Sequence, residues 1–379
     1  MNFHFTEEHR MIQGLARDFA DKEIRPLSKE IDKSSNVPAE LIKKMAELGF
    51  MGIAVPQEYG GAGMDSIALV IAMEEIARAC ASTATIMTVN NSLACEPILR
   101  YGNEEQKKRF LTAVASGKLL GCFALTEAGA GSDAAAIKTT AVKDRDSYIL
   151  NGSKLFVSNG QRAHIAIIFA VTDAAKGHKG ISAFIIEKGT PGFSIGRIEE
   201  KLGIKGSETV EFIFDGCCIP QENLLGHEGH GFKVAMDTLD AGRLGIAAQS
   251  LGIAQACLDA AVRYSKERVQ FGKPISNLQA IQFMISDMAM EIEAARVLTH
   301  RAAYLKDRDG RFIKEASMAK LYASEMANRC AYKAVQIYGG YGYIKDYPVE
   351  RYYRDARITT IYEGTSEIQR LTIAKEILK

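Results

Sequence analysis

A glutamate near the C-terminus lies in surroundings that suit acid–base chemistry. Glu363 belongs to the stretch RYYRDARITTIYEGTSEIQR, residues 351–370. The quartet Ser-Glu-Ile-Gln at 366–369 has the pattern of a capping box, in which the serine caps a helix and the glutamine reaches back to it. We therefore expect a final helix to begin near Glu367. Glu363 would then project from a turn just ahead of a helix N-terminus, and Gly364 would permit close approach of the backbone.

Two opposing effects act on a carboxylate in such a place. An apolar, closed site raises its pKa because desolvation disfavours the charged form, whereas the positive end of a helix dipole lowers it. A carboxylate under both influences can serve as a base. The alternative is a solvated turn glutamate without a catalytic role.

Two segments in the middle of the chain could hold a flat or phosphorylated ligand. The loop FALTEAGAGSD, residues 123–133, offers hydroxyls and backbone N–H groups among small residues, so a pyrophosphate could approach closely without a Walker lysine. The alternative is a flexible loop. The nearby stretch Phe156-Val157-Ser158 could present an aromatic face and a hydroxyl to a ring, or Phe156 could simply be a core residue.

The long apolar segments of the C-terminal third carry a few polar groups. Asp240 and Arg243 are three residues apart on one helix face, where they form an internal ion pair or aim the arginine at a phosphate or purine. Other polar groups stand near helix ends, namely Arg268, Gln279, Gln336, Gly339 and Gly340. His227 and His230 have no companion carboxylate cluster, so we expect no metal site.

Hydrophobic periodicity predicts a helical first part and a β-rich second part. Residues 1–117 read as amphipathic helices, the first of them capped by Thr6. Residues 118–229 carry short β-rich runs without intervening helices, which predicts an antiparallel barrel or sandwich and disfavours a doubly wound nucleotide-binding sheet. Asn151-Gly152 is typical of a turn between two of these strands. The expected strands are 121–125, 147–150, 155–158, 164–171, 181–186 and 209–214.

The third part, residues 230–379, returns to long helices. Three segments with helical periodicity, 231–266, 277–306 and 311–337, are typical of a four-helix bundle. We therefore predict a mainly α chain with a helical N-terminal domain, a central antiparallel β domain and a C-terminal four-helix bundle.

Composition narrows the class of protein. The chain has 379 residues, 47% hydrophobic and 25% charged, with a formal net charge of +1, so neither nucleic acid nor an acidic membrane surface is an expected partner. Its seven cysteines include no CxxC pair, which favours buried thiols in a reduced compartment. No apolar run predicts a membrane span, and the start of the chain is charged and amphipathic rather than a signal peptide. We expect a bacterial cytoplasmic protein, or a mitochondrial matrix protein in processed form.

Taken together, six motifs resemble the acyl-CoA dehydrogenase family in order and spacing, and its short-chain, butyryl-type branch in particular. The resemblance covers practically the whole chain. The motifs are FALTEAGAGSD, the 156–158 strand, DAGR at 240–243, RVQFG at 268–272, QIYGG at 336–340 and IYEGTSEIQR at 361–370.

The resemblance implies a homotetrameric flavoprotein with FAD between the β domain and the C-terminal bundle. Residues implied on the flavin side are Phe123, Leu125, Thr126, Ser132, Phe156, Val157 and Ser158. Those implied to hold the pyrophosphate and adenosine of a neighbouring subunit's FAD are Arg268, Gln279, Gln336, Gly339 and Gly340, while Thr365, Ser366 and Glu367 are implied near the cofactor. Residues implied to line the CoA thioester are Ser132, Asp240, Arg243 and Gly364. The family often has tryptophan at the position of Phe156, so ring packing on the flavin would differ here.

The implied reaction is α,β-dehydrogenation of a short-chain acyl-CoA to the trans-2-enoyl-CoA. Glu363 would remove the α-proton while hydride leaves the β-carbon for the flavin. Some family branches carry the base at the position of Gly242, where glycine cannot serve. The segment 83–97 and the helix after Asp240 are expected to wall the acyl pocket, and electron-transferring flavoprotein is the implied electron acceptor.

Other functions remain open on the sequence. The same fold could work as an enoyl-CoA reductase, as a dehydrogenase of branched or alicyclic acyl-CoA, or as an acyl-CoA oxidase. A non-catalytic scaffold that keeps the fold is the alternative from a different class.

Overall fold

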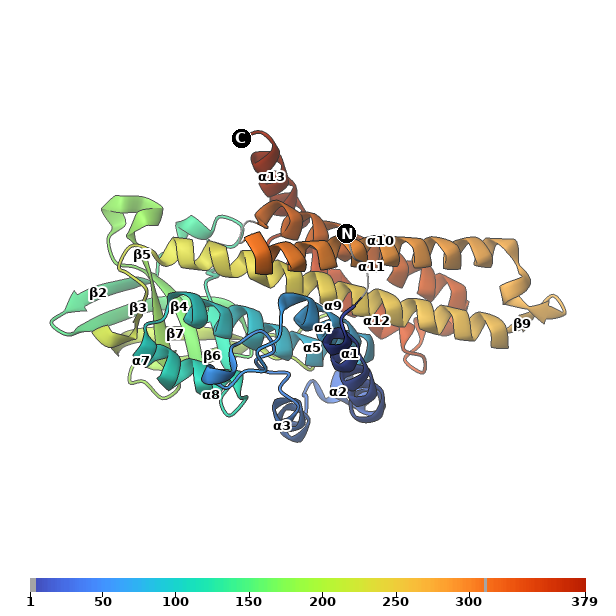
Figure 1. Cartoon of the computed structure of the whole chain (residues 1–379), viewed down its shortest axis with the longest axis horizontal. Coiled ribbons are helices and arrows are strands. Elements are labelled where there is room, and N and C mark those ends of the chain that lie inside the picture. The colour runs from blue at the N-terminus through green and yellow to red at the C-terminus, as the bar shows by residue number, and fades with distance from the viewer. Residues whose placement is uncertain (1–4, 310–311) are drawn as a thin grey trace.

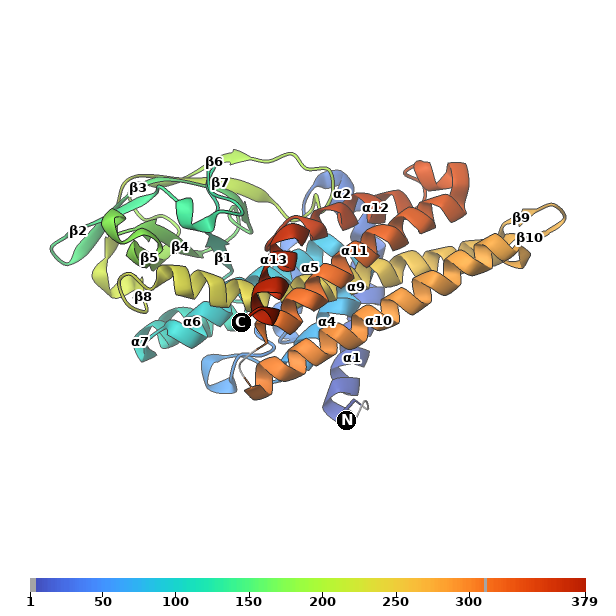
Figure 2. The ribbon, with the colours of Figure 1, turned by 90° about the horizontal axis from the view of Figure 1, so that it is seen from above.

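A computed structural model describes residues 5–309 and 312–379. The molecule is elongated, with a β domain at one end and long helices that run from that domain to the opposite end (Figure 1). The helices of residues 7–88 pack against the middle of the long helices, whereas those of residues 96–115 lie beside the β domain (Figures 1 and 2). The C-terminal helix α13, Ser366–Ile377, projects from the middle of the molecule (Figure 1). The predicted class, mainly helical with a β domain between helical parts, is confirmed.

The first part of the chain is helical, as expected. Thr6 caps α1 by accepting a hydrogen bond from the backbone N–H of His9 at 3.2 Å, which confirms the predicted cap. A π-helical segment, Val89–Cys95, joins α5 to α6. The helices are α1 Glu7–Phe19, α2 Ser28–Ser34, α3 Ala39–Glu47, α4 Ser66–Ala79, α5 Ala81–Thr88, α6 Glu96–Tyr101, α7 Glu104–Gln106 and α8 Thr112–Ala115.

The β domain contains one mixed sheet in the order β6-β7-β3-β2-β4-β5-β8, with β1 paired to β4. Its strands are β1 Gly121–Ala124, β2 Thr140–Asp144, β3 Ser147–Ser158, β4 Ile165–Val171, β5 Ile181–Glu187, β6 Phe193–Ile198, β7 Thr209–Pro220 and β8 Leu224–Leu225.

Two details of the β prediction are wrong. β1 and β2 both pair with β4 in parallel, so the sheet is not wholly antiparallel. Asn151-Gly152 is not a turn but lies inside β3, which joins two of the predicted strands into one. The register of β3 on β7 shifts between Leu150 and Gly152, so this glycine marks a bulge.

The long helices match the predicted segments closely. They are α9 Gly231–Glu267, α10 Gln279–Asp309 and α11 Ile313–Tyr338, and the shorter α12 Val349–Arg357 and α13 Ser366–Ile377 pack on α11. A small hairpin of β9 Val269–Gln270 and β10 Lys273–Pro274 joins α9 to α10. The fourth helix against this group is α4 from the first part of the chain, which packs on both α9 and α10. α9 is long and apolar enough to cross a membrane, but 78% of its apolar window is buried inside the protein, as in a core helix.

The predicted capping box of the last helix is wrong by one residue. The N-cap of α13 is Thr365, whose hydroxyl accepts from the backbone N–H of Ile368 at 3.3 Å. Ser366 instead donates to Glu325 at 2.7 Å, and the Gln369 side chain turns toward the preceding turn. The helix therefore begins where expected, but its first turn is held differently.

The contact between α9 and α4 allows a test of the packing. A Cβ at Gly252 would lie 2.4 Å from the carbonyl oxygen of Glu74 and 2.5 Å from the Cβ of Ala77, so Gly252→Ala must push the two helices apart. We expect a loss of about 1–3 kcal/mol in unfolding free energy, measured by denaturant unfolding. Gly14→Ala in α1 is the matched control, because nothing lies within 4 Å of its Cβ position. Equal stability of the two variants would contradict this packing.

Candidate active site

Glu363 lies in a tight turn between α12 and α13, as predicted. Both Glu363 and Gly364 have left-handed backbone conformations, with φ of 50° and 89°. The turn is held from inside the protein by two side chains. The Gln369 amide donates to the carbonyl oxygens of Glu363 and Gly364 at 3.1 and 3.0 Å, and the Lys320 ammonium donates to the latter at 2.7 Å.

The carboxyl group of Glu363 is directed at α9. A Cβ at Gly242 would lie only 2.0 Å from Oε2 of Glu363 and 3.1 Å from a methyl group of Leu93. Oε2 is buried and has no hydrogen-bond partner among the described residues. Because Gly242 has no side chain, there is room beside α9 for Oε2 of Glu363, which remains able to accept a hydrogen bond.

Burial sets the acidity of this group. Desolvation raises the pKa of Glu363 to about 7, against the opposing attraction of Lys320 and Arg243. The residue as a whole is half-buried, but its Oε2 atom is sealed. A carboxyl group with a pKa near neutrality is suited to accept and release a proton at physiological pH.

Asp240 and Arg243 form the predicted pair beside this carboxyl group. They are both buried, their charged atoms are 2.6 Å apart, and Arg243 also donates to the hydroxyl of Ser317 at 2.9 Å. Nε of Arg243 is buried without a partner among the described residues. The pair is therefore internal, yet the guanidinium keeps one free donor and contributes positive potential at Glu363.

The π-helical segment Val89–Cys95 links this site to the β domain. Its Leu93 contacts the Gly242 region, and its Asn90 accepts from the backbone N–H of Gly121 at the start of β1 at 2.9 Å. The predicted glycine-rich loop follows directly from β1. Part of the segment expected to wall an acyl pocket, 83–97, thus lies between Glu363 and that loop.

The loop itself is anchored by a buried ion pair that the sequence did not suggest. Lys154 is fully buried, and its ammonium contacts Glu127 at 2.7 Å and the carbonyl oxygen of Leu125 at 3.1 Å. Beyond this anchor Ser132 is exposed, and a Cβ at Gly129 or at Gly131 would have nothing within 4 Å. The loop is therefore fixed at its base and open along its glycines.

The expected aromatic face also lies on the surface. Phe156 is 62% exposed with a φ of 57°, at a register shift of β3 between Lys154 and Val157. Val157 is buried and Ser158 half-buried. Phe123, at the start of the loop, is half-buried and packs on Phe169 with ring centroids 4.9 Å apart. Phe156 is therefore on the surface, and the alternative that it is a core residue is wrong.

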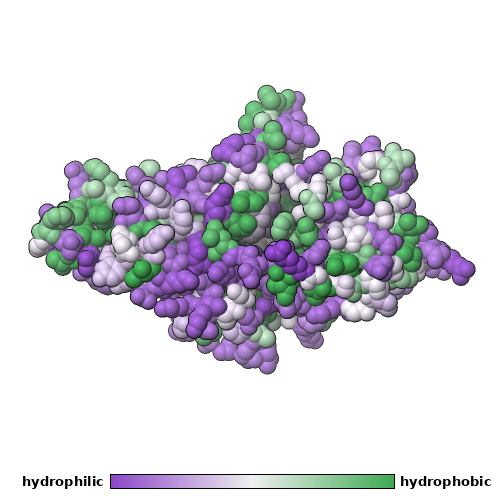
Figure 3. Space-filling view, turned by 180° about the vertical axis from the view of Figure 1, so that it is seen from behind, coloured by the Kyte–Doolittle hydropathy of each residue, from purple (hydrophilic) through white to green (hydrophobic). Residues whose placement is uncertain are grey.

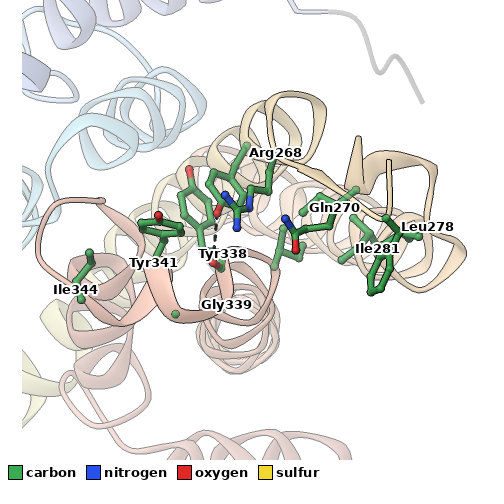
Figure 4. Close-up of a pocket in the computed structure, with 13 residues that line it drawn as sticks. Arg268, Gln270, Leu278, Ile281, Tyr338, Gly339, Tyr341 and Ile344 are labelled. Carbon is green, nitrogen blue, oxygen red and sulfur yellow. Dashed lines mark hydrogen bonds between the residues drawn. The ribbon is translucent and has the colours of Figure 1, made fainter. Parts of the chain in front are cut away.

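A second group of predicted residues lies elsewhere. Arg268, Gly339 and Gly340 line a pocket of about 580 Å³ at the end of the bundle far from the β domain (Figure 4). The Arg268 guanidinium lies 5.4 Å from the ring centroid of Tyr341. Gln336 and Gln279 are exposed near this pocket, at the last turn of α11 and the first residue of α10.

The two groups cannot meet within one chain. Along α9, Arg268 lies about 37 Å beyond Arg243, at about 1.5 Å of rise per residue. The structure thus brings Glu363, Asp240, Arg243 and Gly364 together and leaves the Arg268 pocket apart.

Sequence reasoning missed several residues that shape the site. Lys320 and Gln369 hold the turn, and Lys154 anchors the glycine-rich loop. A signal for Lys320 was present, since Ala316, Ala319 and Ala323 are buried around it on α11 and place the lysine on the inner face.

Relatives of known description match the chain closely. Human short-chain specific acyl-CoA dehydrogenase, mitochondrial, is 54% identical over 98% of this chain and 90% of the relative. Acryloyl-CoA reductase (NADH) of Anaerotignum propionicum is 52% identical over 100% of this chain and 96% of the relative.

Solved structures agree with these sequences. Butyryl-CoA dehydrogenase from Megasphaera elsdenii has a TM-score of 0.98 at 47% identity, with 100% of both chains covered. A chain from a structural study of the electron transferring flavoprotein of Acidaminococcus fermentans and flavin-based electron bifurcation has a TM-score of 0.99 at 51% identity, again with 100% of both chains covered.

Three family models together match most of the sequence. Residues 6–118 match the acyl-CoA dehydrogenase N-terminal domain, 122–217 the middle domain and 229–378 the C-terminal domain. Together with relatives above 50% identity over nearly the full chain, these matches show that this protein belongs to the acyl-CoA dehydrogenase family of flavin-dependent oxidoreductases.

Proposed function

We propose that the chain catalyses the FAD-dependent α,β-dehydrogenation of a short-chain acyl-CoA to the trans-2-enoyl-CoA, with Glu363 as the base. The observation that carries this proposal is the carboxylate oxygen of Glu363, buried without a partner against Gly242. The short-chain and butyryl-CoA relatives at about half identity support the substrate class.

The surface of the β domain fits a flavin. Phe156 is exposed on a left-handed backbone, a conformation that costs energy and is unusual for a bulky residue. A flat ring against Phe156 would account for that arrangement. The open glycines of the loop, with the hydroxyls of Thr126 and Ser132, suit the polar part of FAD. Val157 packs in the core and supports the strand, so it is not proposed as a direct contact.

The chain's own groups explain how the α-proton can be removed. Enolate charge that develops on the thioester oxygen needs a donor, and the backbone N–H of Glu363 has no acceptor among the described residues. The carboxylate of the same residue then takes the proton. Bound FAD supplies the acceptor for the hydride that leaves the β-carbon.

Burial allows the carboxyl group of Glu363 both to accept and to release a proton. Its pKa of about 7 lies close to the operating pH, and exclusion of water by the acyl group strengthens the electrostatic interactions in the site. Asp240 and Arg243 are proposed to line the thioester with Gly364 and Ser132, and Arg243 offers its free Nε donor.

A homotetramer is proposed from the resemblance to the family, and the distance of the Arg268 pocket from Glu363 supports sharing of each cofactor between two chains. We assign this pocket, with Gln279 and Gln336, to the pyrophosphate and adenosine of a neighbour's FAD, and Thr365, Ser366 and Glu367 to the approach to the cofactor. Phe271 beside the pocket is 89% exposed, and apolar residues gather at that end of the molecule and on the projecting α13 (Figure 3). Exposed apolar residues also recur at seven-residue intervals along α10, at Phe283, Met290, Val297 and Tyr304.

Electron-transferring flavoprotein is the proposed electron acceptor. The structure that matches with a TM-score of 0.99 comes from a study of that class of flavoprotein, which supports the pairing. Physiological work as an enoyl-CoA reductase is a second candidate, favoured by the likeness to acryloyl-CoA reductase.

The role of the base can be tested with Glu363→Gln. We expect the variant to keep its yellow flavin, because the amide fills the same space, and to lose anaerobic bleaching by butyryl-CoA by a factor on the order of 10² to 10⁴. Stopped-flow absorbance of the flavin measures both. Undiminished bleaching would refute the assignment, and a colourless wild-type protein would favour the scaffold alternative.

The room made by Gly242 gives a second test. In Gly242→Ala the new methyl group would lie 2.0 Å from Oε2 of Glu363, which is too close for two non-bonded atoms, so the carboxylate must move. We expect bleaching to slow roughly a hundredfold with flavin content unchanged. In the Glu363→Gln background the same change should slow bleaching little further, because the base is already absent. Additive losses would contradict a direct contact between the two positions.

Protein stability reports on the buried carboxyl group without any substrate. The pKa of Glu363 is raised from 4.5 to about 7, so the protonated form stabilises the fold at low pH, and this contribution is lost as pH rises through 7. Glu363→Gln should therefore gain stability relative to wild type between pH 5 and pH 8.5, by on the order of 3 kcal/mol. Thermal unfolding of both proteins across this range measures the difference. Glu367→Gln on the exposed side of α13 should show no such gain, and a flat difference for Glu363→Gln would mean that the carboxyl is not buried.

A further inference from the structure

Lys320 is a buried cation whose only hydrogen bond among the described residues is to the turn that carries Glu363. Its exposed fraction is 0%, although it lies in the middle of α11. The Lys320 ammonium donates to the carbonyl oxygen of Gly364 at 2.7 Å, and no ion pair joins it to a carboxylate among the described residues. Burying an ammonium costs free energy unless it is paired and hydrogen-bonded, and Lys320 has a hydrogen bond but no ion pair among the described residues.

The turn needs to be held. Glu363 is a non-glycine residue with a positive φ, and Gly364 follows with another. Such conformations persist only where surrounding contacts fix them. Lys320 and Gln369 approach from α11 and α13, and together they occupy the carbonyl oxygens of both residues. The backbone N–H of Glu363 donates to no acceptor among the described residues.

Charged groups on the neighbouring elements affect the pKa of both Glu363 and Lys320. Lys320 on α11 and Arg243 on α9 lower the pKa of Glu363, against the larger effect of burial. Glu363 itself, Glu325 on α11 and Glu367 on α13 act in turn on Lys320, which burial holds at a lowered pKa of about 8. Tyr362, beside Glu363, is half-buried and donates a hydrogen bond to the side chain of Gln249.

We propose that Lys320 is a positioning residue for the base: its ammonium, with the Gln369 amide, fixes the turn that aims the Glu363 carboxylate and N–H, and its charge allows that buried carboxylate to ionise. The inference rests on the proposed function of Glu363. Lys320 thus has a positioning task, which is to fix the turn, and an electrostatic task, which is to favour the ionised carboxylate. The two can be separated, because Gln369 shares the positioning but carries no charge.

Separate variants distinguish the two tasks. Lys320→Met removes the donor and the charge, and Gln369→Leu removes only the second donor. Lys320→Gln removes the charge and keeps an N–H donor on a side chain that is one bond shorter. Lys333→Met is the matched control, since Lys333 lies on the same helix but pairs with Asp287 and Glu291 at the surface. Each change is made in the FAD-loaded protein, with and without Glu363→Gln.

The first readout needs no substrate. The difference in thermal unfolding between each variant and its Glu363→Gln partner, followed from pH 5 to pH 9, gives the midpoint at which Glu363 ionises. Both Lys320 variants should move this midpoint upward by about one pH unit or more. Gln369→Leu and Lys333→Met should leave it in place. An unmoved midpoint in both Lys320 variants would overturn the electrostatic task.

The second readout is the pH profile of flavin bleaching by butyryl-CoA. At pH 7, Lys320→Met should be at least about tenfold slower, with partial recovery at higher pH for Lys320→Gln, and Gln369→Leu should be slower at every pH. Wild-type rates in Lys320→Met and in Gln369→Leu would overturn the positioning task. If wild type itself fails to bleach with any acyl-CoA, the proposed function fails, whereas the stability midpoints still decide the role of Lys320.

Discussion

The constraint on which this structure depends is the burial of one carboxylate oxygen without a partner. Oε2 of Glu363 is sealed against Gly242, in a place where a charge is expensive and a side chain on α9 would not fit. Among the described residues, no ion pair neutralises this group directly. The protein surrounds the group with cations that are themselves engaged, Arg243 with Asp240 and Lys320 with the Gly364 carbonyl. The result is a carboxyl group balanced between its two protonation states near pH 7.

Elements that are far apart in the sequence meet around Oε2 of Glu363. α9 supplies the glycine and the Asp240–Arg243 pair, α11 supplies Lys320, and the turn before α13 supplies the carboxylate. The π-helical segment Val89–Cys95 connects this junction to β1 and hence to the glycine-rich loop. Because α9 continues about 37 Å beyond Arg243, one helix carries residues of the Glu363 site in its first half and leads to the Arg268 pocket at its end.

Much of this arrangement could be predicted from local patterns. Helical periodicity placed the three long helices within a few residues of their ends, and the resemblance of six motifs identified the family. Strand pairing could not be read in the same way, since alternation within β1 and β4 does not encode that they run parallel. Asn151-Gly152 has the composition of a turn, but only its partner strand β7 determines that it is a bulge.

The finer geometry of the site was beyond local signals for a similar reason. Thr365 and Ser366 are adjacent hydroxyl residues, and Thr365, the cap, follows directly on the left-handed turn. That turn is held by Gln369 nearby and by Lys320, which is 44 residues away from Gly364 in the sequence. The alanines around Lys320 place it on the inner face of α11. Its contact with the carbonyl oxygen of Gly364 becomes evident only when α11 is packed against the final turn.

The most direct test of the account is exchange of the α-hydrogens of bound butyryl-CoA with deuterated solvent, followed by NMR under anaerobic conditions. This measurement observes proton abstraction alone, separately from hydride transfer and from the electron acceptor. The account predicts rapid exchange with the wild-type flavoprotein and none above background when Glu363 is replaced by glutamine. Exchange at the wild-type rate in that variant would contradict the central claim that this buried carboxylate is the base.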